Sequence, residues 1–106
     1  MDKKSALDSL HRFRLALESK GIRIRKLVLY GSYAQGKAKE GSDIDVLVIS
    51  DDFLGTSYWE RLEILSDAIY EVFEPIEAVA LTNEEWERGD RVVVDYAKKG
   101  EVIFSA

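Results

Sequence analysis

The chain has 106 residues, of which 46% are hydrophobic and 33% charged, and its formal net charge at neutral pH is −5. This length predicts one domain over residues 1–106, large enough for one hydrophobic core but too small to include a separate substrate domain. The negative charge argues against general nucleic-acid binding, which depends on Lys and Arg side chains that neutralise phosphates. The absence of cysteine excludes a disulfide framework, a thiolate zinc site and a cysteine nucleophile.

No segment has the length and hydrophobicity of a membrane span, and the polar N-terminus lacks the apolar stretch of a signal peptide. We therefore expect a cytoplasmic protein without a membrane partner. The charge is unevenly distributed. Residues 1–50 carry 10 basic and 6 acidic side chains, whereas residues 51–106 carry 5 basic and 14 acidic ones. The acidic second half suits a basic partner.

The first half of the chain predicts two helices and two strands. Periodicity and end signals place a helix over residues 3–20, a strand over 23–30, a short helix over 33–38 and a strand over 44–50. Gly21 fits the C-terminal end of the first helix. The strand over 44–50 is apolar on both faces beyond its acidic start, which is typical of a central strand.

The second half begins with a loop and continues with alternating helices and strands. The pattern predicts a helix from Ser57 to Pro75 with an apolar stripe of Leu62, Leu65, Ile69, Val72 and Phe73, a strand over 76–81, a short helix over 82–89 and a strand over 102–104. The first and third of these begin at capping boxes, Ser57-x-x-Glu60 and Thr82-x-x-Glu85. Residues 90–99 are ambiguous, because three consecutive valines favour a strand while the spacing of Val93, Tyr96 and Ala97 fits a helix.

Asp43 and Asp45 stand at the start of the second strand. Side chains two apart along a strand point to the same face, so the two carboxylates lie about 7 Å apart at the edge of a buried surface. Such a pair repels and loses hydration unless a cation compensates it. Oxygen ligands favour Mg²⁺ or Mn²⁺, which take further ligands from water and substrate phosphate. Two such ions would hold the attacking and leaving oxygens of a phosphoryl or nucleotidyl transfer.

Gly31 and Ser32 form a turn after the first strand. Glycine allows a sharp turn and lets a phosphate approach the backbone, while Ser32 offers a hydroxyl group. Free N–H groups at the start of a short helix favour an anion. The turn is therefore expected to hold a triphosphate over the metal ions. The alternative is an ordinary Gly-Ser turn, followed by solvated aspartates before an ordinary strand.

Residues 31–49 read GSYAQGKAKEGSDIDVLVI. Gly-Ser, ten residues and Asp-x-Asp together resemble the signature of the DNA polymerase β-like nucleotidyltransferase superfamily, in particular its minimal nucleotidyltransferase domains. The resemblance implies an α+β fold, with a small mixed β-sheet flanked by helices around a polymerase β-like nucleotidyltransferase core. It also favours a helix over residues 90–99. Within the site, it implies that Asp43 and Asp45 hold two Mg²⁺ ions and that the nucleotide contacts Gly31, Ser32 and Ser42.

Members of this superfamily usually carry a third carboxylate on a neighbouring strand, and Glu77 is the candidate here. It starts the strand over 76–81, where it shares a face with Val79 and Leu81. We expect it to complete the catalytic metal site and to serve as general base for the attacking hydroxyl. The family often has aspartate at this place, so the longer glutamate changes the geometry. An exposed glutamate without a role is the alternative.

Gln35 is a second departure from the pattern, because many minimal nucleotidyltransferases have arginine there. Lys37 or Lys39 would substitute for the missing charge if a phosphate contact needs one. Both lysines also fit the description of ordinary solvated loop residues.

The resemblance implies Mg²⁺-dependent transfer of a nucleoside monophosphate, AMP from ATP, to a hydroxyl group on a partner protein. Domains of this size often resemble the antitoxin half of a two-gene module whose toxin is a HEPN-domain ribonuclease. In that context the antitoxin adenylylates a tyrosine of the toxin, which implies a hetero-oligomer. The composition and spacing of this sequence do not themselves indicate that role.

Two other classes of function stay open. One is a non-catalytic antitoxin module that neutralises its partner by binding, through the acidic second half and the exposed aromatic residues. The other is modification of a small molecule, as in aminoglycoside nucleotidyltransferases. The lack of an acceptor domain argues against the second.

Overall fold

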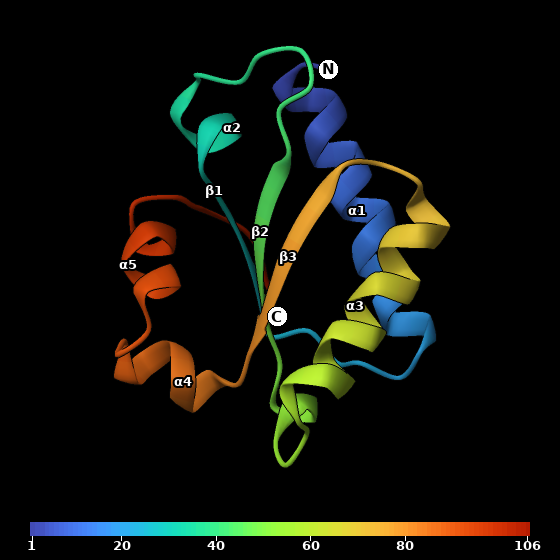
Figure 1. Ribbon diagram of the computed structural model, residues 1–106, viewed down its shortest axis with the longest axis vertical. Coiled ribbons are helices and arrows are strands. Elements are labelled where there is room, and N and C mark those ends of the chain that lie inside the picture. The colour runs from blue at the N-terminus through green and yellow to red at the C-terminus, as the bar shows by residue number, and fades with distance from the viewer.

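A computed structural model describes the whole chain, residues 1–106. Its elements in chain order are α1 (Lys3–Ser19), β1 (Lys26–Tyr30), α2 (Ser32–Gln35), β2 (Ile44–Ile49), the 3₁₀-helix η1 (Asp51–Phe53), α3 (Tyr58–Val72), β3 (Ile76–Leu81), α4 (Asn83–Arg88), α5 (Val92–Lys98) and β4 (Glu101–Ser105). A mixed sheet flanked by helices results (Figure 1), so the predicted α+β fold class is confirmed. None of the helices is long and apolar enough to cross a membrane.

The sheet has the strand order β3-β2-β1-β4. β1 pairs antiparallel with both β2 and β4, whereas β2 pairs in parallel with β3. Because a parallel pair needs a long crossover, α3 runs between β2 and β3 across one face of the sheet. The prediction that residues 44–49 form a central strand is confirmed, since β2 lies between two neighbours and most of its side chains are buried.

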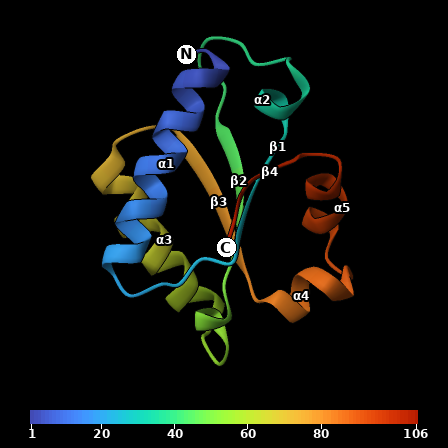
Figure 2. The same cartoon turned by 180° about the vertical axis from the view of Figure 1, so that it is seen from behind.

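Alternation along the strands divides the core into two parts, one on each face of the sheet. On one face, alternate strand residues such as Leu29 and Val46 pack in a cluster with buried residues of α1 and α3. On the other face, Val28 and Leu47 belong to a smaller cluster that includes Val94 of α5. Figures 1 and 2 show the two pairs of helices, α1 with α3 and α4 with α5, on opposite sides of the sheet. The smaller cluster covers less of its face, and residues at the end of the sheet there stay accessible.

Two predicted boundaries in the first half were wrong by a few residues. β1 begins at Lys26 rather than Arg23, because the Arg23 backbone N–H donates to the Asp52 carboxylate (N–O distance 2.6 Å) instead of to a strand. The short helix begins at Ser32 and ends at Gln35, because Gly36 adopts a left-handed conformation (φ 71°). The other elements follow the predicted order, including the helix in the ambiguous segment over 90–99.

The apolar stripe predicted for α3 was partly wrong. Leu65 and Val72 are buried, but Leu62 is 37% exposed and Phe73 is 84% exposed. Phe73 lies beyond the helix in a left-handed conformation (φ 57°), which turns the chain away before Pro75. The helix therefore ends earlier than the prediction, which used Pro75 as the terminator. Ala68 takes the buried position between Leu65 and Val72.

Both predicted capping boxes are present. The Ser57 and Thr82 hydroxyls accept hydrogen bonds from the backbone N–H groups of Glu60 and Glu85, and both glutamates bond back to the capping residue. Ser57 is exposed, whereas Thr82 is buried. The second box lies directly after β3 and positions α4 against the sheet.

We expect Ser57→Ala to lower the free energy of unfolding by about 1 kcal/mol and Thr82→Ala to lower it by about 2 kcal/mol. The difference arises because water can replace the lost bond at exposed Ser57 but not at buried Thr82. Urea unfolding of both variants beside the wild type measures the two costs. Equal costs, or a larger cost at Ser57, would contradict this account.

Candidate active site

One end of the sheet brings together residues that are far apart in the sequence. β1 ends there at Tyr30, and both β2 and β3 begin there. The register places Tyr30 opposite Asp45, and Asp45 beside Glu77 on the neighbouring parallel strand. Since paired residues present their side chains on the same face, all three point toward the α5 side of the sheet.

A groove of about 610 Å³ opens at this end of the sheet. The residues that line it come from the three strands β1, β2 and β3, the Gly31 turn, the end of α2, and α5 with the residue after it: Tyr30, Gly31, Gln35, Asp45, Glu77, Val79, Val92, Val93, Tyr96 and Lys99. Three of the predicted site residues, Gly31, Asp45 and Glu77, therefore share one groove.

Asp45 carries an uncompensated negative charge. Burial raises its pKa, and the nearby carboxylates of Glu77 and Asp43 raise it further. None of these three side chains makes an ion pair or hydrogen bond within the chain, although nine ion pairs form elsewhere. A cation in the groove would relieve both the repulsion and the lost hydration.

Gly31 packs directly against Asp45. A Cβ atom added at Gly31 would collide with the Asp45 Oδ2 atom, and the backbone there has φ 73° and ψ −152°, a conformation that side chains disfavour. Only glycine therefore lets the turn approach the carboxylate this closely.

The three carboxylates do not form a complete metal site by themselves. No group of three or more Asp, Glu, His or Cys side chains is arranged to hold a metal ion. Asp45 is partly buried, while Asp43 and Glu77 are exposed. The oxygen donors nevertheless fit Mg²⁺, which takes one or two protein carboxylates and completes its shell with water and substrate phosphates. The residues present thus suit a metal ion that arrives with a nucleotide.

The serines and lysines of the motif lie differently. Ser32 begins α2, and its side chain makes no hydrogen bond within the chain. The Ser42 hydroxyl accepts a hydrogen bond from the Lys39 backbone N–H (2.8 Å) and so helps to close the loop before β2. Lys37 and Lys39 are exposed and do not line the groove, whereas Gln35 does.

Sequence reasoning missed three polar groups of the groove. Burial raises the pKa of Tyr30 to about 12, with further contributions from Asp45 and Glu77, so its phenol stays neutral at physiological pH. Because side chains two apart in a strand share a face, Tyr30 could have been predicted on the same face as Val28. Tyr96 comes from α5 and Lys99 follows it directly, and nothing in the sequence indicates that this helix borders the motif.

The comparison with known families agrees with this geometry. Residues 10–103 match the family described as the nucleotidyltransferase domain. The chain belongs to this family. As a nucleotidyltransferase, it has its Gly-Ser turn and Asp-x-Asp strand meeting at one end of the sheet.

Curated relatives and solved structures extend the comparison. Two proteins of Methanocaldococcus jannaschii, each named "putative protein adenylyltransferase", are 48% and 36% identical over 44 and 56 residues. These matches cover 41% and 53% of this chain, and the chain spans only 44% and 55% of the relatives' lengths.

Two solved structures share the fold. One is a "putative nucleotidyltransferase" of Sulfolobus solfataricus, with a TM-score of 0.62 and 20% identity, over 95% of this chain and 87% of the other. The other is described as a toxin-antitoxin with AMP-PNP, with a TM-score of 0.60 and 23% identity, over 89% and 72% of the two chains.

Gly31→Ala and Gly36→Ala form a matched pair, because both glycines have positive φ (73° and 71°) but a Cβ at Gly36 meets nothing within 4 Å. We expect Gly36→Ala to cost about 1 kcal/mol of stability and to leave Mn²⁺ affinity unchanged. Gly31→Ala should displace the Asp45 carboxylate and weaken Mn²⁺ binding, measured with ATP present, by at least about tenfold. Equal Mn²⁺ affinities in the two variants would refute the contact.

Asp45→Asn should stabilise the metal-free protein at pH 7. The raised pKa means that the folded chain binds the Asp45 proton more tightly than the unfolded chain does, so ionisation above that pKa destabilises the fold. The gain should therefore disappear as the pH falls below the ordinary value of 3.8, where Asp45 is protonated in both states. Urea unfolding at the two pH values tests this, with exposed Asp67→Asn as the control. A gain that does not depend on pH would rule it out.

Proposed function

We propose that this nucleotidyltransferase is a protein adenylyltransferase, which moves AMP from ATP to a hydroxyl group of a partner protein and depends on Mg²⁺. The observation that carries the proposal is the register of Asp45 with Glu77 beside Gly31, in a groove where neither carboxylate forms an ion pair within the chain. The names of the two archaeal relatives support protein adenylylation, and the AMP-PNP of the solved neighbour supports an adenine nucleotide.

The proposed reaction is an in-line displacement at the α-phosphorus of ATP. The acceptor oxygen forms a bond to that phosphorus, the bond from the phosphorus to the bridging α–β oxygen breaks, and pyrophosphate leaves. The proton of the acceptor hydroxyl passes to Glu77, which is exposed and therefore accessible to it. Mg²⁺, as two ions when bound, would neutralise phosphate charge and align the acceptor with the leaving group.

Each motif residue has a proposed role. Asp43, Asp45 and Glu77 would hold the metal ions, and their unpaired carboxylates supply the charge that two divalent cations need. Gly31 is proposed to give the phosphates access to the backbone of the turn, and it lets that turn lie directly against the Asp45 carboxylate. Ser32 would donate its free hydroxyl to a phosphate. The Ser42 hydroxyl accepts a hydrogen bond from the Lys39 N–H, and it is proposed to donate its own hydrogen to the nucleotide.

The proposed partner is the toxin of a toxin–antitoxin pair, a HEPN-type ribonuclease, with which this chain would form a hetero-oligomer as its antitoxin. The toxin-antitoxin complex among the solved neighbours supports the class of partner. Residues 51–106 carry 14 acidic and 5 basic side chains, and this negative charge suits a basic protein surface. Adenylylation of a ribonuclease would silence it without any need for nucleic-acid binding by this chain.

One observation favours a second candidate, a binding module that acts without catalysis. Trp59, Tyr70 and Phe73 are 73%, 80% and 84% exposed along and just after α3. Large apolar side chains in solvent are typical of protein interfaces. Such a module would neutralise its partner whether or not the carboxylates are intact.

Labelling of proteins separates the two candidates. The purified chain is incubated with Mg²⁺, α-labelled ATP and host lysate, beside the variant Asp43→Asn, Asp45→Asn. We expect a labelled protein band only with the intact aspartates. The variant Asp8→Asn, Glu18→Gln removes the same charge from α1, outside the acidic second half of the chain, and it should label like the wild type. No label from the wild type with any NTP, together with stable capture of a partner by both double variants, would favour the binding module.

A further inference from the structure

β3 forms an outer edge of the sheet on the side of the candidate active site. The carbonyl groups of Pro75 and Leu81 accept hydrogen bonds from β2 and the residue after it. Because the backbone groups of successive residues in a strand point in opposite directions, Ala78 and Ala80 direct theirs away from β2. No loop or turn hydrogen bond uses the Ala78 backbone or the Ala80 N–H group.

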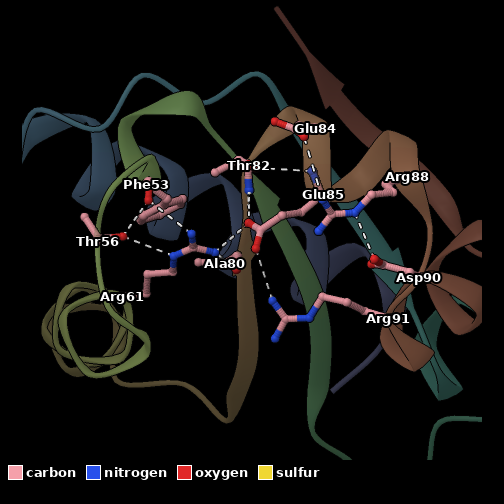
Figure 3. A network of polar contacts seen from close by, with 10 residues as sticks. All are labelled: Phe53, Thr56, Arg61, Ala80, Thr82, Glu84, Glu85, Arg88, Asp90 and Arg91. Carbon is pink, nitrogen blue, oxygen red and sulfur yellow. Dashed lines mark hydrogen bonds and ion pairs between the residues drawn. The ribbon is translucent and has the colours of Figure 1, made fainter.

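One end of this edge is closed by Arg61, as Figure 3 shows. Its guanidinium donates to the Ala80 carbonyl (3.2 Å), to the Phe53 carbonyl (3.1 Å) and to the Glu85 carboxylate (2.7 Å). The Ala80 carbonyl, which points away from β2 near α4, thus already accepts a hydrogen bond. The open part of the edge lies around Ala78, at the end of β3 that carries Glu77.

A cavity of about 170 Å³ runs along the same edge. Tyr58, Leu62 and Leu65 of α3 form one wall, while Glu85 and Arg91 lie on the other side. Its floor is β3 itself at Ala78, Val79 and Ala80, where the two alanines leave space for another chain. Val79 also lines the groove of Asp45 and Glu77, so the cavity and the groove adjoin at this residue.

We infer that the acceptor protein binds by adding an extended segment to the open edge of β3, with its hydroxyl-bearing residue beside Glu77. This inference rests on the proposed protein adenylyltransferase activity and specifies how that activity selects its acceptor. The Ala78 N–H and carbonyl groups provide the main-chain hydrogen bonds, and the apolar wall of α3 accepts a side chain.

Strand spacing places such a segment suitably for the reaction. A strand added outside β3 lies about 4.8 Å from β3 and about 10 Å from β2. A residue paired with Glu77 presents its side chain on the same face as Glu77 and Asp45, because paired residues share a face. The acceptor hydroxyl therefore reaches the groove without a separate substrate domain.

The charge of the surroundings defines the kind of segment. All walls of the cavity come from residues 51–106, which carry 14 acidic and 5 basic side chains. Arg61 and Arg91 both pair with the one carboxylate of Glu85, so the cavity lining itself holds two guanidinium groups and one carboxylate. A complementary segment therefore carries an acidic or neutral side chain beside Arg91, and basic side chains only toward Asp45 and Glu77 in the groove.

Ala78→Pro tests the inference, because it removes an outward N–H group and leaves the bonds between β3 and β2 in place. Ala78→Val is the matched control, since valine has a similar size and keeps the N–H group. Both full-length variants are incubated with Mg²⁺, α-labelled ATP and host lysate, beside the wild type. Circular dichroism and the affinity for ATP measure whether the fold and the nucleotide site are unchanged.

We expect at least about tenfold less protein label with Ala78→Pro than with Ala78→Val, at equal ATP affinity, because both side chains fill the floor of the cavity and only proline lacks the N–H group. Wild-type label that persists in Ala78→Pro would overturn the edge inference and leave adenylyl transfer standing. Absence of label from the wild type would instead overturn the proposed function, and with it this inference.

Hydrogen exchange of the wild-type chain covers the case in which Ala78→Pro does not fold. The protein that is labelled in the lysate is purified without label and added to the chain with Mg²⁺ and AMP-PNP. Slower exchange of the Ala78 and Ala80 amides is the expected result. Unchanged exchange at both amides while the proteins remain bound would overturn the inference.

Discussion

The parallel register of β2 and β3 is the constraint on which the site depends. It sets Asp45 beside Glu77, and only a parallel pair starts both strands at the same end of the sheet. The long crossover that this pairing needs is α3, which covers one face and leaves the other to α4 and α5. Because β1 is antiparallel to β2, its last residue, Tyr30, reaches the same end and places the Gly31 turn there.

Two carboxylates of this fold show how structural and functional charges differ. Burial tends to raise the pKa of Glu85, but the Thr82 N–H and the Arg61 guanidinium outweigh it and lower that pKa. Glu85 thus joins α3, β3 and α4 through compensated charge (Figure 3). The pKa of Asp45 shifts the other way, because burial and the neighbouring carboxylates both raise it. Glu85, which connects structural elements, is paired with Arg61, whereas Asp45, where a metal ion would bind, has no arginine beside it.

The sequence allowed the elements to be predicted wherever the signal was local. Both capping boxes and the strands over 44–49 and 76–81 depend on neighbouring residues, and the structure has them. The helix over 92–98 is present too, but its prediction needed the family resemblance, because three consecutive valines left the local pattern ambiguous. Phe73 was misplaced because helical spacing cannot indicate that the chain leaves the helix at that residue. Asp45, Glu77 and Gly31 were predicted from strand alternation and resemblance, whereas Tyr96 and Lys99 depend on the packing of α5, which no local pattern encodes.

Of the two edge strands of the sheet, β3 lines the groove and β4 does not. β4 lies on the far side of β1, two strands away from β2, whereas β3 carries one of the groove's carboxylates. An unpaired edge is normally a risk for aggregation, and Arg61 protects β3 at Ala80. The protection stops before Ala78, although an ordinary structural edge would benefit from it along its whole length. A binding edge must stay unpaired where its partner reacts, and on β3 that place is beside Glu77.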